Sequence, residues 1–196
     1  MKLLIASNNK DKIKEIKLFL EDIENIEIFS LNDLNININF QEVGKTLLEN
    51  ALIKARTVYN IAHLPTLADD SGIFIDALGG FPGVKSSDFQ KENKEYLEKI
   101  LKMMKDKKNR KAYFRCILVF INDGKERVFE GEVEGEISYE IRGDKGFGYD
   151  PIFYYKPFQK TFGEIDLSIK NKISHRGIAL QKFKEYLIQV HLSKTP

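Results

Sequence analysis

Two adjacent carboxylates, Asp69 and Asp70, are the strongest candidates for chemistry in this sequence. They stand between two apolar stretches, so we expect them at the end of a strand, where Gly72 would permit a tight turn. Neighbouring carboxylates repel each other unless a positive charge lies beside them. Mg²⁺ is one ion that could supply this positive charge, because it binds one or two protein carboxylates together with phosphate oxygens. A solvent-exposed acidic turn is the alternative. Glu42, taken alone, gives no signal.

A second candidate is a polar segment that follows a short apolar strand and opens a helix: Ser7, Asn8, Asn9, Lys10, Asp11 and Lys12. The first N–H groups of a helix lie at the positive end of its dipole and bind anions readily. Lys12, in the first turn, could turn its ammonium group toward a phosphate. The alternative is ordinary N-capping by Asn9 with solvated lysines.

Two further segments carry groups that suit a nucleotide base. Residues 146–151 combine glycines, two aromatic rings and an acid, and aromatic rings stack on bases. Lys170, His175 and Arg176 bring cationic donors to the start of the last expected helix, where the helix dipole disfavours them. An anionic or carbonyl-bearing ligand would explain them. Packing aromatics and a structural histidine are the alternatives.

The elements that must position these residues follow from apolar periodicity. Strands are expected over residues 2–6, 26–29, 111–121, 126–132 and 152–154, with a hairpin turn at Asn122-Asp123-Gly124. Helices are expected over residues 10–21, from a capping box at Thr46 onward, over 91–104, and after Ser174. The second of these helices should bury Leu48, Leu52, Ala55, Tyr59 and Ala62. Early strand–helix alternation and a later hairpin predict an α/β fold with a mixed sheet.

Composition narrows the class of protein. The formal charge is +2, from 31 basic and 29 acidic residues, so the chain lacks the basic field of a sequence-independent nucleic-acid binder. A hydrophobic content of 42% is typical of a globular protein, and no apolar run approaches the ~18 residues of a membrane span. We expect one domain over residues 1–196, in the cytoplasm. Cys116 is interpreted as a small buried hydrophobe.

The order of these segments resembles the non-canonical purine nucleoside triphosphate pyrophosphatases, which act on inosine and xanthosine triphosphates. The similarity extends from residue 5 to about residue 180. The matching motifs are Ala6-Ser7-Asn8-Asn9 with Lys12 and Glu15, Glu42 before Gly44, Glu49-Asn50-Ala51 with Lys54-Ala55, Leu67-Ala68-Asp69-Asp70-Ser71-Gly72, Ala77-Leu78-Gly79-Gly80 with Pro82-Gly83-Val84, Gly131-Glu132-Val133-Glu134-Gly135, Gly146-Phe147-Gly148-Tyr149-Asp150-Pro151-Ile152-Phe153 and Ile173-Ser174-His175-Arg176-Gly177.

The resemblance implies an elongated mixed β-sheet flanked by helices, with two lobes around a central substrate cleft, usually in a homodimer. It also implies Mg²⁺-dependent hydrolysis of ITP, dITP and XTP to the monophosphate and pyrophosphate. Glu42 and Asp70 would bind Mg²⁺, and Asp70 would also act as the general base, supported by Asp69. The residues implied to bind substrate are Ser7, Asn8, Asn9, Lys10, Asp11, Lys12, Lys54, Ser71, Phe147, Gly148, Tyr149, Asp150, Lys170, His175 and Arg176.

One loop departs from the family pattern, and two alternative functions stay open. Residues 85–89 read Lys-Ser-Ser-Asp-Phe where the family commonly shows Tyr-Ser-Ala-Arg-Tyr, so the role of this loop is not predicted. The first alternative is a Maf-like pyrophosphatase acting on pyrimidine or modified nucleotides. The second is a non-enzymatic module that binds nucleotides or RNA. The near-neutral charge and the acidic pair disfavour this second alternative.

Overall fold

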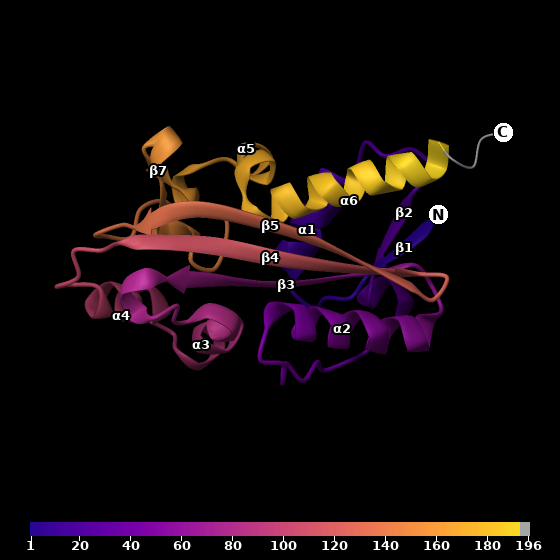
Figure 1. Cartoon of the computed structure of the whole chain (residues 1–196), viewed down its shortest axis with the longest axis horizontal. Coiled ribbons are helices and arrows are strands. Elements are labelled where there is room, and N and C mark those ends of the chain that lie inside the picture. The colour runs from indigo at the N-terminus through magenta and orange to yellow at the C-terminus, as the bar shows by residue number, and fades with distance from the viewer. Residues whose placement is uncertain (193–196) are drawn as a thin grey trace. The chain divides into compact units, whose positions relative to one another are not determined.

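The computed structural model describes residues 1–192 and contains one seven-stranded sheet (Figure 1). The strands lie in the order β2-β1-β3-β4-β5-β6-β7. β1 pairs in parallel with β2 and β3, whereas β6 pairs antiparallel with β5 and β7. The predicted mixed sheet is therefore confirmed. The strands are β1 Lys2–Ile5, β2 Glu27–Ser30, β3 Thr66–Ile75, β4 Lys111–Asn122, β5 Lys125–Ile137, β6 Phe153–Tyr155 and β7 Lys160–Thr161.

Six α-helices accompany the sheet in the described part of the chain. They are α1 Lys10–Phe19, α2 Leu47–Ala62, α3 Ser86–Glu92, α4 Tyr96–Met103, α5 Leu167–Ile173 and α6 His175–Leu192. The predicted hairpin joins β4 to β5 through Asp123 and Gly124, which both have positive φ, as a tight two-residue turn requires. Within residues 1–192, no helix is both long and apolar enough to cross a bilayer.

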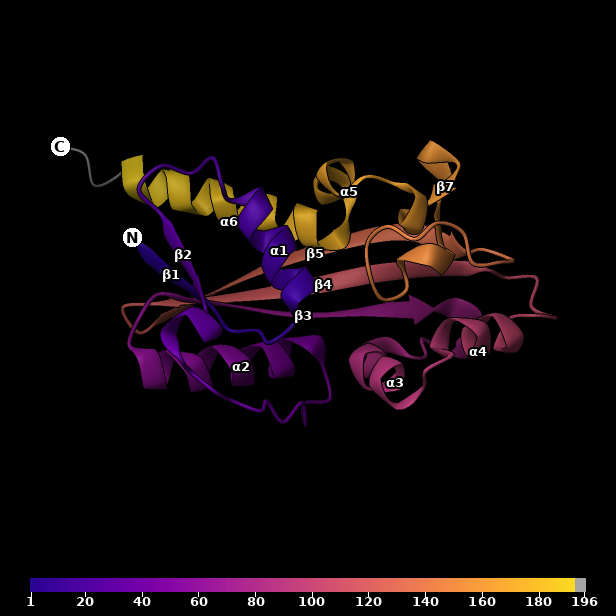
Figure 2. The same cartoon turned by 180° about the vertical axis from the view of Figure 1, so that it is seen from behind.

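The chain folds into two compact units, each assembled from separate stretches of sequence. The first contains residues 1–70 and 116–131 and the chain from Arg176 onward, and the second contains residues 71–115 and 132–175. In the first unit, α2 lies on one face of the strands, and α1 and α6 lie on the other (Figures 1 and 2). Its core includes Ile5, Ile16, Leu67, Leu118, Phe120, Leu180, Phe183 and Leu187. The spacing of apolar residues after Ser174 predicts that the C-terminal helix buries Leu180, Phe183, Leu187 and Val190; the first three are buried, and Val190 is only half-buried.

The second unit has an aromatic core. The ring of Phe114 stacks on His175, with centroids 4.6 Å apart, and meets the ring of Phe153 at the same distance. Phe153 in turn packs against Phe162, with centroids 4.9 Å apart. Such contacts stabilise a core beyond the area they bury. They connect β4, β6 and the start of α6 within this unit.

The strand that carries the acidic pair does not end where the sequence predicted. β3 continues unbroken from Thr66 to Ile75, so Asp69 and Asp70 lie inside a buried strand. The predicted turn at Gly72 is wrong. A Cβ atom at Gly72 would lie 2.3 Å from the carbonyl oxygen of Gly83, so the glycine is needed for close backbone approach.

Two helix predictions also need correction. The helix expected over residues 91–104 is split, because Asn93 adopts extended backbone angles and its side chain donates to the carbonyl of Phe89 at 2.8 Å. The expected buried face of α2 is wrong in part: Ala55 is buried as predicted, but Leu48 is 39% exposed, and Leu52, Tyr59 and Ala62 are only half-buried. The residues that α2 buries are Leu47, Asn50, Ala51, Lys54, Ala55 and Val58. Apolar spacing missed this face because two of its members are polar.

Candidate active site

Asp69 and Asp70 are consecutive in β3, and their carboxylates have different partners. Successive side chains of a strand point to opposite faces of the sheet. Asp69 contacts Lys12 of α1 and Arg176 of α6, whereas Asp70 contacts Lys54 of α2. These helices lie on opposite faces of the first unit (Figure 1). Asp69 therefore pairs with two cations and Asp70 pairs with Lys54, and the expected repulsion is offset on both faces.

Asp70, Glu42 and Lys54 form one charge cluster. The Nζ atom of Lys54 donates to Oδ1 of Asp70 at 2.6 Å and to Oε1 of Glu42 at 3.2 Å. Asn50 donates to Oδ2 of Asp70 at 3.4 Å, and its own Oδ1 accepts the N–H of Gly44 at 2.8 Å. This second bond ties the segment carrying Glu42 to α2. The structure thus brings together the two carboxylates predicted to share a metal ion.

Burial shifts the proton affinities in this cluster. Desolvation raises the pKa of Asp70 above its ordinary value of 3.8, and the ammonium groups of Lys54 and Lys12 oppose this without cancelling it. Desolvation also disfavours the charged form of Lys54, but Asp70 and Glu42 outweigh it and raise the pKa of Lys54. A carboxylate with a raised pKa accepts a proton more readily near neutral pH, which is what a general base must do.

Asp69 is the centre of a second buried network in the first unit. Its Oδ1 accepts from the ammonium of Lys12, and its Oδ2 accepts from Nε of Arg176 at 2.8 Å. Nη1 of Arg176 also donates to Glu15 of α1. Burial favours protonated Asp69, but the charges of Arg176 and Lys12 outweigh burial and hold the pKa of Asp69 well below its usual range. Asp69 is therefore an ionised anchor for both cations.

The start of α1 is capped by Asn9. Its Oδ1 accepts the N–H groups of Asp11 at 2.9 Å and Lys12 at 3.0 Å, and Oγ of Ser7 accepts the N–H of Asn9 at 3.1 Å. The alternative interpretation of this segment, N-capping by Asn9, is therefore confirmed. An anion bound here would replace the cap or use exposed side chains. The exposed side chains of this segment are those of Asn8, Asn9, Lys10 and Asp11.

In the second unit, three predicted substrate residues form a compact group. Lys170, 1% exposed, donates to Oδ2 of Asp150, and its Nζ lies 4.8 Å from the centroid of the Phe147 ring. The N–H of Phe147 donates to the same carboxylate oxygen at 2.8 Å. Gly146 has a φ of +72°, and a Cβ there would lie 2.2 Å from Asp150. The loop is thus shaped around this carboxylate.

Tyr149 and Gly148 are held by contacts within the same unit. The Tyr149 side chain is buried, and its hydroxyl donates to the carbonyl of Ser86 at 2.8 Å. The ring meets Tyr96 edge to face with centroids 5.2 Å apart, and the hydroxyl of Tyr96 donates to the carbonyl of Gly148 at 2.8 Å. These contacts fix the loop over residues 146–151 against α4 and the start of α3.

The other two predicted substrate residues differ in exposure. His175 is buried in the aromatic core of the second unit, where it stacks on Phe114 with an interplanar angle of 11°. Ser71 is partly exposed and follows Asp70 in β3. Contacts of these residues with a substrate stay predictions.

Sequence reasoning gave no role to three residues that contact the acidic pair directly or through Arg176. Cys116 lies in the core as expected, but its Sγ donates to Oδ2 of Asp69 at 3.1 Å. Asn50 supports Asp70, and Glu15 orients Arg176. Glu15 and Asn50 stand in the family motifs, and their polarity on buried helix faces was the available signal. Nothing in an apolar strand marked Cys116.

The chemistry of Glu42 and Asp70 fits a hard divalent cation. Both supply carboxylate oxygens, and together they carry one more negative charge than Lys54 balances. Within residues 1–192, no group of three or more His, Cys, Asp or Glu side chains is arranged to hold a metal ion. Water and phosphate oxygens would have to complete the coordination, as is usual for Mg²⁺.

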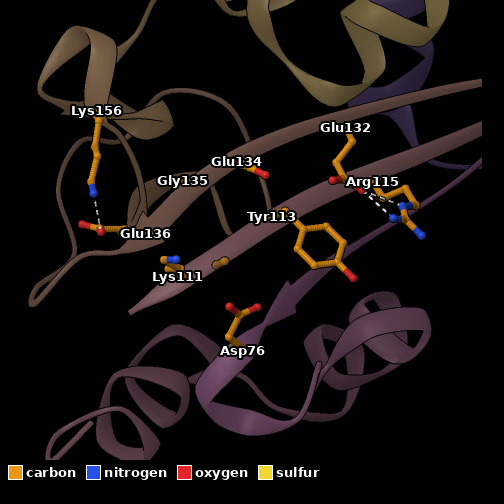
Figure 3. Close-up of a pocket in the computed structure, with 10 residues that line it drawn as sticks. Asp76, Lys111, Tyr113, Arg115, Glu132, Glu134, Gly135, Glu136 and Lys156 are labelled. Atoms are coloured by element: carbon orange, nitrogen blue, oxygen red, sulfur yellow. Dashed lines mark hydrogen bonds and ion pairs between the residues drawn. The ribbon is translucent and has the colours of Figure 1, made fainter. Parts of the chain in front are cut away.

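A separate pocket lies in the second unit, on β4 and β5 (Figure 3). It has a volume of about 540 Å³, and the ring of Tyr113 lies in it beside Asp76. Among its lining residues, Arg115 pairs with Glu132 and Lys156 pairs with Glu136 (Figure 3). None of the predicted catalytic, metal-binding or substrate-binding residues lines this pocket.

Comparison with known proteins places these residues in a family context. The Ham1 family profile matches residues 3–186. A dITP/XTP pyrophosphatase of Clostridium tetani is 45% identical over 94% of this chain and 95% of its own length. A HAM1 protein structure from Coxiella burnetii is 39% identical, with a TM-score of 0.86 over 96% of this chain and 99% of that one. The Ham1 protein structure from Staphylococcus aureus is 33% identical, with a TM-score of 0.85 over the same shares.

These matches cover nearly the whole chain, and they agree with the resemblance drawn from the motifs. The Maf-like alternative finds no support in them. The α/β fold and the recognised motifs are both explained by one conclusion: the chain belongs to the Ham1 family.

Proposed function

We propose that this protein hydrolyses the non-canonical purine triphosphates ITP, dITP and XTP to the monophosphate and pyrophosphate. The observation that carries the proposal is the cluster of Glu42, Asp70 and Lys54, in a chain 45% identical to a dITP/XTP pyrophosphatase. Mg²⁺ dependence and a homodimer are parts of this proposal that come from the sequence resemblance, and a cytoplasmic location is a part that comes from the hydropathy of the sequence.

The residues of the first unit would neutralise the phosphates and activate water. Glu42 and Asp70 would hold Mg²⁺, which when bound supplies positive charge to the phosphate oxygens. Lys12 and Lys54 would add charge of their own, and phosphoryl transfer depends largely on such electrostatic stabilisation and positioning. Asp70, buried and with a raised pKa, would take the proton of the attacking water. Asp69 would keep Lys12 in position.

The protein would select among purine bases by the chemical group at the 6-position of the ring. Inosine and xanthine carry a carbonyl acceptor there, whereas adenine carries an amino donor. Backbone N–H groups offer only donors. Adenine would set a donor against a donor, and a buried unsatisfied polar group costs about 1–3 kcal/mol. One such contact corresponds to roughly a tenfold to 150-fold preference.

A side-by-side turnover experiment tests the proposal. ITP, dITP, XTP, ATP, GTP and a pyrimidine triphosphate are supplied separately, with Mg²⁺ and with EDTA, and pyrophosphate and orthophosphate are measured independently. We expect pyrophosphate from ITP, dITP and XTP, at least about tenfold faster than from ATP, as one mismatched contact requires. Equal turnover of ATP, release of orthophosphate, or a preference for the pyrimidine would overturn the assignment. Full activity in EDTA would show that the proposed Mg²⁺ dependence is wrong.

A further inference from the structure

The side chain of Lys54 stands between the two carboxylates that are proposed to bind a metal ion. Its Nζ lies 2.6 Å from Oδ1 of Asp70 and 3.2 Å from Oε1 of Glu42. The Lys54 side chain is 6% exposed, so water does not screen these contacts strongly. One ammonium group therefore contacts both carboxylates and balances one of their two negative charges.

A divalent cation and this ammonium would compete for the same oxygens. Two cations that contact the same carboxylates lie close together and repel each other strongly in a buried site. Lys54 is attached to a helix whose position is fixed by packing, but its side chain has four rotatable bonds. It can leave the carboxylates without a movement of α2 if another anion takes its charge. A triphosphate is such an anion.

We propose that Lys54 is an internal counter-ion that keeps the metal site of Glu42 and Asp70 closed until a polyanionic substrate draws its ammonium away. The inference rests on the proposed function, since it assumes that these carboxylates bind a divalent cation. Its consequence is a coupling: metal binds weakly to the free protein and tightly together with the nucleotide. Such coupling is reciprocal, so the metal also favours nucleotide binding.

Metal affinity of the nucleotide-free protein tests the counter-ion role apart from catalysis. Mn²⁺ is used as the probe, and its free concentration is followed by electron paramagnetic resonance. Lys54→Met keeps the length of the side chain without its charge, and Lys54→Gln also keeps a hydrogen-bond donor. We expect each to bind Mn²⁺ at least tenfold more tightly than the wild type. Lys54→Arg keeps the charge, so its Mn²⁺ affinity should stay within about threefold of that of the wild type, which is well below the tenfold gain expected for the other two variants.

Lys12→Met is the matched control, because Lys12 contacts Asp69 on the other face of β3. It removes one positive charge from the same unit without opening the pair of carboxylates. An increase in Mn²⁺ affinity that is at least several-fold larger in Lys54→Met and Lys54→Gln than in Lys12→Met supports the counter-ion role. When Glu42→Gln is added to Lys54→Met, the increase in Mn²⁺ affinity should disappear, because one of the two carboxylates is lost. Circular dichroism identifies any variant that does not fold, and the other Lys54 variant then decides.

Two failures are distinguishable. If the folded Lys54 variants bind Mn²⁺ no more tightly than the wild type, while the wild type hydrolyses dITP with Mg²⁺, the counter-ion role is wrong and the proposed function stands. If the wild type hydrolyses no purine triphosphate and no variant binds Mn²⁺, both the proposed function and this inference are wrong. Equal increases in Mn²⁺ affinity in Lys12→Met and Lys54→Met would mean that removing any nearby positive charge has the same effect. This result would overturn the inference.

Discussion

Nε of Arg176 donates to Oδ2 of Asp69 at 2.8 Å and joins two residues that are 107 positions apart in the sequence. Both side chains are 2% exposed or less. A buried pair of this kind resists removal of one partner: without Asp69, Arg176 would have to rely on Glu15, and Lys12 would lose its carboxylate partner, in a medium of low polarity. The pair therefore assigns Asp69 to the stability of the fold, whereas the proposed general base is its neighbour Asp70.

Asp69→Asn should lower the free energy of unfolding by about 3–5 kcal/mol, the usual cost of breaking a buried ion pair. Urea denaturation at pH 7 measures the change. Asp76→Asn, at an exposed carboxylate, is the control and should stay within about 0.5 kcal/mol of the wild type. An Asp69→Asn protein as stable as the control would show that the pair does not anchor the fold.

Asp70→Asn should reduce kcat for dITP by at least about 10²-fold, because asparagine cannot accept the proton of water. Its melting temperature should stay near that of the wild type, since the substitution keeps the shape of the side chain and Lys54 retains Glu42. Initial rates of pyrophosphate release and a thermal melt provide the two measurements. Wild-type kcat in this variant would remove Asp70 from the role of base.

Cys116 offers a comparison of two small side chains. Cys116→Ser keeps a donor for Asp69, whereas Cys116→Ala removes it at nearly the same volume. A hydrogen bond to a charged group contributes about 1.5–3 kcal/mol, so the serine protein should be more stable than the alanine protein by roughly that amount. Urea denaturation of both tests this. Equal stability would mean that the thiol serves only as packing.

Asp150→Asn should destabilise the second unit, because it leaves the ammonium of Lys170 buried with a weaker partner. We expect a loss of about 3–5 kcal/mol. The double variant Asp150→Asn with Lys170→Met removes both charges and should recover part of this loss. The two denaturation curves are compared directly. A double variant less stable than the single one would argue that each residue is held by other contacts.

Asp33 should make stability depend on pH at the acid end. The N–H of Ser30 and the ammonium of Lys17 bind its carboxylate and lower its pKa to about 2 from 3.8. The folded state then binds fewer protons than the unfolded state in this window, so the contribution is full above about pH 4 and is lost as the pH falls toward 2. Wild type and Asp33→Asn should therefore differ in stability at pH 6, and the difference should shrink as the pH falls from about 4 to about 2. A constant difference would contradict this.

Sequence reasoning found most of the elements but misjudged where polar residues are buried. Strands such as β1 and β2, and the hairpin at Asp123-Gly124, follow from local apolar patterns and turn chemistry that need no distant partner. β3 was interrupted in the prediction because two aspartates look like a strand end. Their counter-ions, Lys54 and Arg176, come from distant segments that no local pattern connects to the strand.

In the candidate site, too, sequence reasoning found some residues and missed contacts that depend on distant segments. Motif order identified Glu42, Asp70 and Lys54, and the structure places them in one cluster. The apolar pattern of α2 failed there, since Asn50 and Lys54 occupy buried positions that periodicity reserves for hydrophobic residues. Cys116 could not be found at all, because its role depends on a contact with a residue 47 positions away.

The unbroken course of β3 also restricts which genetic changes this protein can tolerate. A strand has two sides and a period of two, so loss or gain of a single codon between Thr66 and Asp69 would exchange the sides of both carboxylates at once. Asp70 would then lie on the face of Arg176, and Asp69 would lie on the face of Lys54. Substitutions can be explored here one at a time, but a change in length cannot.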